Sequence, residues 1–271
     1  MSGTFETVTS ADGTAIALER AGDGPVIVLV GGAFNDRSTV RALGAELAAA
    51  GFTAIGYDRR GRGASGDSPG YAVQREVEDI AAVVGHASDG QAGGAARLFG
   101  HSSGAVLVLE AAAAGLPVSR VAAYEPPFII GDSRPRPAAD LPDRIRKLVE
   151  EGNRDDAAAL FLTEGTAAPP QVVAGMRASD SWGWFSGLAH TLPYDSLICG
   201  PGNALEAGRL AAISVPTLAI GGSASPPWLS GGARAVAEAV AGARYETLDG
   251  QDHGVLNQPA TLRPLLTSFF S

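Results

Sequence analysis

A serine enclosed by two glycines stands where an apolar run gives way to an alanine-rich stretch. Residues 98–107 read Leu-Phe-Gly-His-Ser-Ser-Gly-Ala-Val-Leu, so Gly100, Ser102 and Gly104 form a Gly-x-Ser-x-Gly pattern. This predicts a strand, a sharp turn and a helix, because so tight a turn leaves no room for side chains at its flanks. The backbone N–H of Ser103 would begin the helix, whose positive end favours a developing oxyanion. The pattern therefore predicts a serine nucleophile that attacks a carbonyl group, and a chance match in a glycine-rich chain is the alternative.

The segments around this serine alternate between strand and helix patterns. Apolar runs predict strands, and helical spacing predicts helices between them. The order strand, helix, strand, helix, strand predicts a parallel sheet with helices on both faces. Ser102 would then lie at the carboxyl end of a central strand, where such sheets bind ligands. The five segments, in order, are residues 25–30, 40–50, 52–57, 76–84 and 95–99.

Further strands are predicted towards both ends of the chain. Residues 4–8 and 14–19 are short strand-like runs joined through Asp12-Gly13, a dipeptide typical of hairpins, so we expect an antiparallel ribbon. A strand at 118–124 is ended by Pro126-Pro127. The last part of the chain predicts strands at 215–221 and 244–248, a helix at 230–240 and a C-terminal helix.

The alternation breaks between residues 126 and 207. A proline-rich start is followed by helical patterns at 143–151, from Asn153 to Leu162, and at 171–177. Because no strand pattern intervenes, we interpret 126–207 as a helical insertion. The α/β core would then consist of residues 1–125 and 208–271.

The composition excludes several classes of protein. The 271 residues are 45% hydrophobic and 18% charged, which allows a large core and suits one α/β domain. The net charge of −9 opposes binding to nucleic acid or to an anionic membrane. A single cysteine, Cys199, allows neither an internal disulfide nor a multi-cysteine metal site. No apolar run reaches membrane-spanning length and the first residues do not read as a leader, so we expect a cytoplasmic protein.

The order of these motifs resembles that of the α/β-hydrolase fold superfamily. The likeness rests on Gly31-Gly32-Ala33 after a strand, the Asp-Arg-Arg-Gly-Arg-Gly-Ala-Ser loop at 58–65, the turn around Ser102, and a late Gly-x-x-His that ends at His253. It covers the whole chain apart from details of the insertion. The resemblance implies a mostly parallel eight-stranded α/β-hydrolase sheet with helices on both faces. It also makes the insertion a small helical cap, or lid, over the active site.

The resemblance further assigns catalytic roles. Ser102 would be the nucleophile and His253, which follows the last strand, the general base, because an imidazole can take the serine proton and return it to the leaving group. The backbone N–H groups of Ser103 and Ala33 would form the oxyanion hole. Gly31-Gly32 replaces the His-Gly pair usual in relatives, so we expect the hydrogen bonding that this histidine supplies to be missing.

The acid of the triad is absent from its usual place. The turn after the seventh strand, 221–227, reads Gly-Gly-Ser-Ala-Ser-Pro-Pro and contains no carboxylate. Glu125 ends the sixth strand at the same sheet edge, and some relatives, haloalkane dehalogenases among them, carry their acid there; we therefore favour Glu125. Asp252 is too close in sequence to turn back easily onto His253, and Asp249 is a weaker candidate. A dyad without any acid stays open.

A serine nucleophile limits the substrates. Attack on a haloalkane or an epoxide would leave a stable ether, whereas an ester, lactone or thioester leaves an acyl-enzyme that water can cleave. Phe34 and His101 are assigned to the substrate pocket, beside the oxyanion donor and the serine. In the lid, Trp182, Trp184 and Phe185 either line an apolar pocket or pack the lid onto the core.

The first part of the insertion carries a local basic cluster in an acidic chain. The cluster would receive an anionic substrate or the phosphopantetheine of an acyl carrier, or it forms an ordinary solvated helix face, which we favour. Its members are Arg134, Arg136, Arg144, Arg146 and Lys147.

The leading hypothesis is a serine hydrolase that cleaves carboxylic esters, lactones or thioesters through an acyl-enzyme on Ser102, without cofactor or metal. One alternative is a non-hydrolytic cyclase or lyase on the same fold, in which His253 moves protons and water is kept out. Another is a degenerate hydrolase that serves as a binding protein. We expect a small-molecule acyl substrate as partner, no nucleic acid and no membrane, and a monomer or homodimer.

Overall fold

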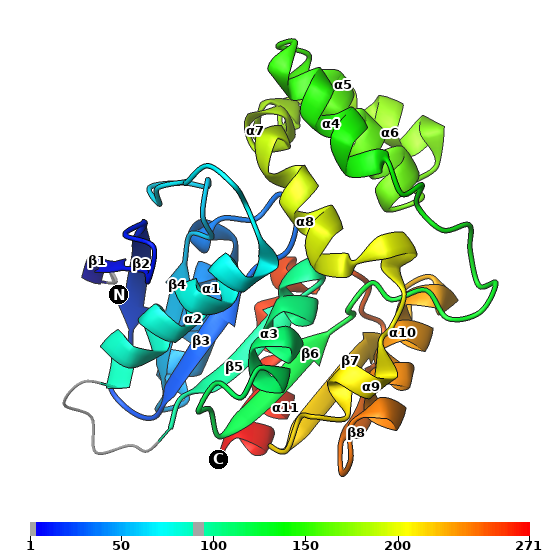
Figure 1. Ribbon diagram of the computed structural model, residues 1–271. Helices are drawn as coiled ribbons and strands as arrows, with labels where there is room; N and C mark the ends of the chain where they lie inside the picture. The colour runs from blue at the N-terminus through cyan, green and yellow to red at the C-terminus, as the bar shows by residue number, and fades with distance from the viewer. Residues whose placement is uncertain (1–3, 89–94) are drawn as a thin grey trace.

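An eight-stranded sheet runs through the protein, whose computed structural model describes residues 4–88 and 95–271 (Figure 1). The strand order is β1-β2-β4-β3-β5-β6-β7-β8. β1 pairs antiparallel with β2 and β2 antiparallel with β4, whereas all the other neighbours pair parallel. The predicted fold class is confirmed. The strands are β1 Thr4–Thr9, β2 Ala15–Ala21, β3 Val26–Val30, β4 Thr53–Tyr57, β5 Arg97–His101, β6 Arg120–Tyr124, β7 Thr217–Gly222 and β8 Arg244–Leu248.

Helices cover both faces of the sheet, as the alternating pattern predicts. α2, α3 and α10 contribute to one hydrophobic core, and α1 and α11 contribute to the other on the opposite face. Every residue of β3 is buried, because a central parallel strand is covered from both sides. These helices are α1 Arg37–Ala49, α2 Val73–Ser88, α3 Ser103–Ala113, α10 Pro227–Ala239 and α11 Arg263–Phe270.

Short helices occupy the chain between β6 and β7, where the helical insertion is expected. In Figure 1, α4 to α7 gather away from the sheet, and α8 leads back towards it. This part, residues 126–207, is called the cap below; its limits as a separate unit stay a prediction. Its elements are α4 Leu141–Glu150, α5 Arg154–Leu160, the π-helical η1 Phe161–Gly165, α6 Pro170–Arg177, α7 Trp182–Gly187, η2 Ala189–Thr191, α8 Leu192–Cys199 and η3 Pro201–Asn203. The short helix α9 Ala207–Leu210 begins where the cap ends and leads towards β7.

Strand register brings three chain segments together at the carboxyl edge of the sheet. The backbone N–H of Ser102 donates to the carbonyl of Tyr124 at 2.9 Å, and that of Glu125 donates to the carbonyl of Ile220, also at 2.9 Å. The carboxyl ends of β5, β6 and β7 therefore lie side by side, with Ser102 and Glu125 directly after the first two. Two further turns, η4 Val255–Asn257 and η5 Pro259–Thr261, follow β8 and lead into α11.

The longest helix in the described part of the chain is α2, with 16 residues. Among residues 4–88 and 95–271, every helix falls short of what a bilayer crossing requires in length or hydrophobicity.

Candidate active site

Ser102 occupies a sharp turn between β5 and α3. Its φ of 58° lies in the left-handed region, which a residue with a side chain adopts only when its surroundings impose it. A Cβ on Gly100 would come within 2.3 Å of the carbonyl oxygen of Gly104, and a Cβ on Gly104 within 2.3 Å of that of Val30. Both glycines of the motif are therefore required by close backbone packing, as the sequence predicts.

His253 follows β8 and reaches this serine. Its Nε2 lies 3.1 Å from the Oγ of Ser102, within hydrogen-bonding distance. Its Nδ1 lies 2.7 Å from Oε2 of Glu125. The three side chains therefore form a hydroxyl, imidazole and carboxylate chain, the arrangement that a catalytic triad needs.

Glu125 is fully buried at the end of β6. Its second carboxylate oxygen, Oε1, accepts the backbone N–H of Gly222 at 2.8 Å, so both oxygens have partners. The two competing acids point elsewhere: Asp252 accepts the N–H of Gly254, and Asp249 accepts the hydroxyl of Ser223. Of these candidates, only Glu125 contacts His253.

The loop after β3 lies against the nucleophile. A Cβ on Gly32 would come within 2.7 Å of the Cβ of Ser102, which shows how closely this loop approaches it. The next residue is Ala33, whose N–H the resemblance assigns to the oxyanion hole together with that of Ser103, the first residue of α3. The first N–H groups of a helix have no partner inside the helix, so Ser103 has a free donor at the positive helix end.

Two side chains hold this loop where relatives use a histidine. Asn35 Oδ1 accepts the N–H of Gly32 at 2.9 Å. Arg62 Nη1 donates to the carbonyls of Gly32 at 2.5 Å and of Asn35 at 3.0 Å. The bonding of that histidine is missing, as expected from the sequence, but Asn35 and Arg62 supply other hydrogen bonds to this loop that the sequence motif does not reveal.

His101 packs against His253 and bonds to its backbone. Its Nε2–H donates to the carbonyl of His253 at 2.8 Å, and the ring centroids lie 4.7 Å apart. Burial, with the neighbouring charge of His253, lowers the pKa of His101 to about 3. The ring therefore stays neutral and supports the loop that carries His253, while its edge also borders the cavity described next.

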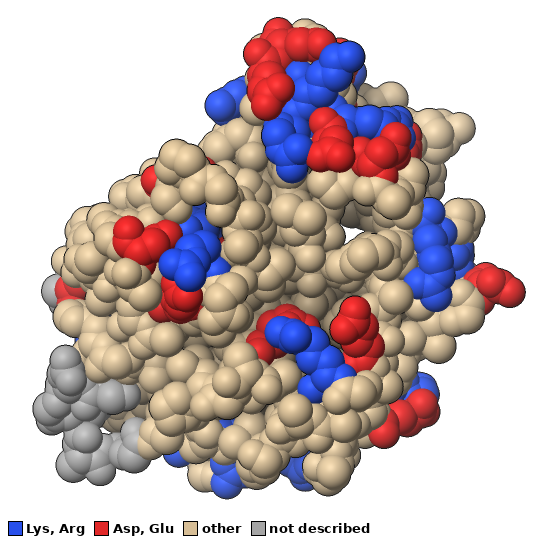
Figure 2. Space-filling view, viewed as in Figure 1, with Lys and Arg blue, Asp and Glu red and all other residues tan. Residues whose placement is uncertain are grey.

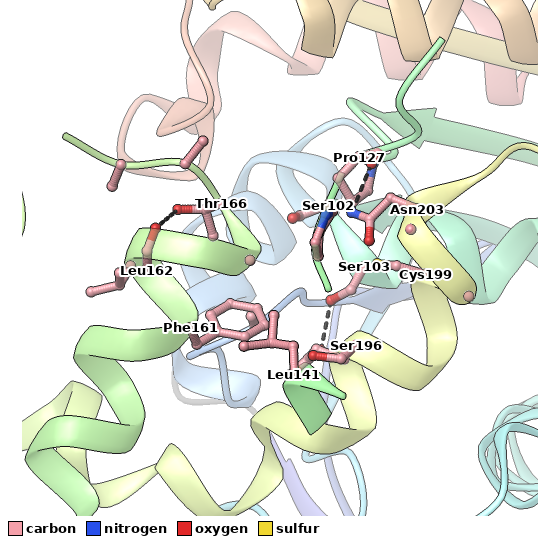
Figure 3. A pocket seen from close by; sticks show the side chains of 18 of the residues that line it. Ser102, Ser103, Pro127, Leu141, Phe161, Leu162, Thr166, Ser196, Cys199 and Asn203 are labelled. Carbon is pink, nitrogen blue, oxygen red and sulfur yellow. Dashed lines mark hydrogen bonds between the residues drawn. The ribbon is translucent and has the colours of Figure 1, made fainter. Parts of the chain in front are cut away.

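A cavity of about 500 Å³ opens over Ser102 between the sheet edge and the cap (Figure 3). Both Phe34 and His101, which the sequence analysis assigns to a substrate pocket, line this cavity. The π-helical turn η1 contributes Phe161, Leu162 and Gly165 from the cap side. Most of the lining is apolar, and its polar members are His101, Ser102, Ser103, Thr166, Asp195, Ser196, Asn203 and His253.

The lid aromatics lie one layer away from this cavity. Trp182 is buried, and its indole N–H donates to Asp155. Trp184 donates to the carbonyl of Phe34, and Phe185 contacts the Phe34 ring at a centroid distance of 4.9 Å. All three residues are outside the cavity lining. Trp184 and Phe185 pack the lid against Phe34 of the core, whereas Trp182 contacts Asp155 and Phe185 within the lid.

The basic cluster of the cap also lies outside the lining. Arg144 pairs with Glu164, Arg146 with Asp143, and Lys147 lies near Glu151. Figure 2 shows these mixed charges side by side at the top of the cap. The other two arginines bond to backbone carbonyls: Arg134 to Pro135, Glu164 and Gly165, and Arg136 to Ile129 and Gly202. The favoured interpretation, a charged helix face, fits Arg144, Arg146 and Lys147, whereas Arg134 is buried.

Sequence reasoning missed a buried ionic cluster beneath the loop between β3 and α1, residues 31–36, which is called the oxyanion loop after the role assigned to Ala33. Arg59 and Arg62 belong to the loop at 58–65, which the sequence offers only as one motif of the resemblance, yet each is 1% exposed. They pair with Asp195 of α8, and Arg59 also pairs with Glu76 of α2. A run of three arginines within four residues after a buried strand was the available signal, because buried arginine requires acidic partners from elsewhere in the chain.

Comparisons with known proteins agree with this architecture. Residues 27–264 match the alpha/beta hydrolase family. An alpha/beta hydrolase from Sphaerobacter thermophilus DSM 20745 is 48% identical, with a TM-score of 0.90, over 98% of this chain and all of that one (100%). Two other solved structures show a similar fold. A thermophilic esterase from Thermogutta terrifontis, with malate bound, is 20% identical, with a TM-score of 0.70 over 98% of each chain. The enol-lactonase from Burkholderia xenovorans LB400 is 21% identical, with a TM-score of 0.68 over 97% of this chain and 99% of that one. No curated protein matches the chain.

Proposed function

Because the chain belongs to the alpha/beta hydrolase family, we propose that it is a serine hydrolase that cleaves a carboxylic ester, a lactone or a thioester. The observation that carries the proposal is the continuous contact from Ser102 through His253 to Glu125, with separations of 3.1 and 2.7 Å. This order of groups is what removes a proton from a serine as it attacks.

In the proposed mechanism, Ser102 Oγ attacks the substrate carbonyl while His253 Nε2 accepts the hydroxyl proton. Glu125 accepts the Nδ1–H of His253, which keeps Nε2 free to act as the base and stabilises the imidazolium. The N–H groups of Ser103 and Ala33 receive the developing oxyanion. His253 then protonates the leaving alcohol or thiol, and water, activated by the same imidazole, releases the acid from Ser102.

The cavity supports a neutral acyl substrate of small to medium size. Its volume of about 500 Å³ is typical of sites for small organic molecules. Among the lining residues that the structure describes, Asp195 is the one carboxylate, and its charge is paired with Arg59 and Arg62. The names of the two proteins of similar fold, an esterase and an enol-lactonase, are consistent with an ester or lactone substrate.

The alternative of a cyclase or lyase depends on a missing acid. Because the carboxylate of Glu125 contacts His253, the reason for considering a cyclase or lyase is lost, and the hydrolytic proposal is better supported. Binding without catalysis is the remaining alternative, and covalent labelling distinguishes it.

The test is reaction with a fluorophosphonate, which phosphonylates an activated serine. We expect stoichiometric labelling of the wild type and none of Ser102→Ala, together with a loss of p-nitrophenyl butyrate hydrolysis of at least ~10⁴-fold. Ser119→Ala, whose hydroxyl bonds to the carbonyls of Ala95 and Ala96 far from the motif, is the matched control and should label normally. A folded wild type that neither labels nor turns over would refute the proposal.

A further inference from the structure

Asp195 is a cap residue in contact with the active-site turn, and the proposed mechanism leaves it without a role. Its carboxylate is 1% exposed and lies where α8 passes over the start of α3 (Figure 1). Oδ1 accepts the Ser103 hydroxyl at 2.7 Å and Arg59 Nη1 at 2.7 Å, and Oδ2 accepts Arg62 Nη2 at 2.7 Å. Although burial alone would raise the pKa of Asp195, the charges of Arg62 and Arg59 lower it, so the group is a carboxylate.

One of these bonds acts on the first oxyanion donor. The Ser103 hydroxyl donates to Asp195, while the backbone N–H of Ser103 is the donor assigned to the oxyanion. Ser103 is 2% exposed and is the first residue of α3, where no intrahelical bond holds the N–H. The bond to Asp195 therefore restrains Ser103, whose backbone N–H must point at the oxyanion.

The other bonds act on the second donor through Arg62. Arg62 Nη1 donates to the carbonyl of Gly32, and this C=O shares one planar peptide unit with the N–H of Ala33. In a trans peptide the C=O and N–H point in opposite directions. An arginine that holds the Gly32 carbonyl on one side therefore directs the Ala33 N–H to the other side. Asp195 accepts a hydrogen bond from Nη2, the other terminal nitrogen of the same guanidinium.

We propose that Asp195 is the positioning residue of the oxyanion hole, because it restrains Ser103 directly and Ala33 through Arg62. The inference rests on the proposed serine hydrolase function and adds a cap residue to it. The helical cap would thus contribute to catalysis by orienting backbone donors as well as by enclosing substrate. Since one carboxylate helps to restrain both donors, its removal should weaken transition-state binding far more than substrate binding.

The experiment compares Asp195→Asn with Asp79→Asn in the full chain. Asp79 is the matched control, because it is fully buried and pairs bidentately with an arginine, Arg60, at 2.7 and 2.8 Å. None of its hydrogen bonds reaches the oxyanion loop or α3 within the described residues. The two variants should lose similar stability. A difference in their kcat values therefore reflects the positions of the oxyanion donors rather than the fraction of folded protein.

We expect Asp195→Asn to lower kcat for p-nitrophenyl butyrate by ~10²-fold, the scale of losing an oxyanion donor, with KM changed less than about threefold. The affinity for an alkyl trifluoromethyl ketone, whose serine adduct places an oxyanion in the same position, should fall by a similar factor. This affinity is measured by ¹⁹F NMR, which requires no turnover. Asp79→Asn should keep kcat and ketone affinity within about threefold of the wild type.

A second variant covers the case in which Asp195→Asn fails to fold. Ser103→Ala removes one bond and leaves both ion pairs of Asp195, so it should fold and lower kcat and ketone affinity by about 3- to 10-fold, with KM unchanged. The inference is wrong if these variants match Asp79→Asn, or if kcat falls while ketone affinity stays at the wild-type value. A wild type without turnover and without ketone adduct would instead contradict the proposed function.

Discussion

At Glu125 the backbone takes a φ of 45°, a conformation that costs a non-glycine residue about 1 to 2 kcal/mol. The turn sends the side chain from the end of β6 back across the sheet edge, where Gly222 and His253 contact its two oxygens. A charge-assisted hydrogen bond contributes about 1.5 to 3 kcal/mol, which is enough to offset the conformational cost. The position therefore suits a carboxylate that orients an imidazole.

Replacement of Glu125 by glutamine tests this role at the residue scale. The amide keeps the size of the side chain but can present an N–H to Nδ1 of His253, which stabilises the tautomer whose Nε2 is already protonated. We expect kcat for p-nitrophenyl butyrate to fall by about 10³- to 10⁴-fold with little change in thermal stability, measured by steady-state kinetics and thermal unfolding.

Asp252→Asn is the control for this variant, because Asp252 is adjacent to His253 in sequence but bonds to the N–H of Gly254. Its rate should remain within a few-fold of the wild type. Near-normal turnover in Glu125→Gln, or a steep loss in Asp252→Asn, would remove Glu125 from the mechanism.

At the scale of elements, three neighbouring strands end in strained turns at one edge. Phe34 follows β3, Ser102 follows β5 and Glu125 follows β6, with φ values of 59°, 58° and 45°. The other two non-glycine residues with positive φ in the described chain, Ala167 and Asn203, both line the cavity. Backbone strain is therefore concentrated around the proposed site, as is common where function requires unusual geometry.

The contact between α3 and β3 gives an element-scale prediction. A Cβ at Gly104 would lie 2.3 Å from the Val30 carbonyl oxygen and 2.6 Å from that of Gly31, so Gly104→Ala must push α3 away from the sheet. We expect the free energy of unfolding to fall by about 1 to 3 kcal/mol and turnover to fall with it, since the serine and both oxyanion donors shift. Urea unfolding and ester hydrolysis measure the two effects.

Gly231→Ala in α10 is the matched glycine control, because a Cβ there has nothing within 4 Å. In a helix interior this change should raise the free energy of unfolding by about 0.5 to 1 kcal/mol, with activity unchanged. Equal effects of the two substitutions would contradict the packing argument for Gly104.

At the scale of the whole molecule, the cavity is a joint product of core and cap. The core supplies Ser102, His253 and Phe34, while η1 and α8 supply the opposite wall. Phe34 is also buried in the hydrophobic cluster of the cap, together with residues of α4, α5 and α7. The enclosing wall and the oxyanion loop are therefore parts of one packed unit. A substrate that enters the cavity also experiences the net charge of the whole molecule.

Net charge and lining predict discrimination against anionic esters. The chain carries a formal charge of −9, and the lining contains neither lysine nor arginine among its described residues. We expect kcat/KM for a hemisuccinate ester to be at least about tenfold lower than for the butyrate ester of the same alcohol. Because screening weakens repulsion, that ratio should narrow as ionic strength rises from ~0.01 to ~0.5 M. Preference for the hemisuccinate would indicate that a basic side chain of the cap reaches the substrate.

The sequence by itself determined the fold class, because hydrophobic periodicity and Gly100, Ser102 and Gly104 are local requirements that a linear reading captures. It also predicted the hairpin through Asp12-Gly13 and the helical character of 126–207. These features depend on neighbouring residues or on tight turns, so they are visible without coordinates.

Only the tertiary structure decided which carboxylate contacts His253, since Glu125 lies 128 residues away and Asp252 is its neighbour. It likewise decided that Trp182 packs beside Asp155 rather than against the cavity, and that Asp195 joins Arg59 and Arg62 beneath the oxyanion loop. Charged side chains can be buried only with partners from distant segments, and strand register sets which segments meet. Such contacts leave no local periodicity in the chain, so they appear only once the sheet and cap are assembled.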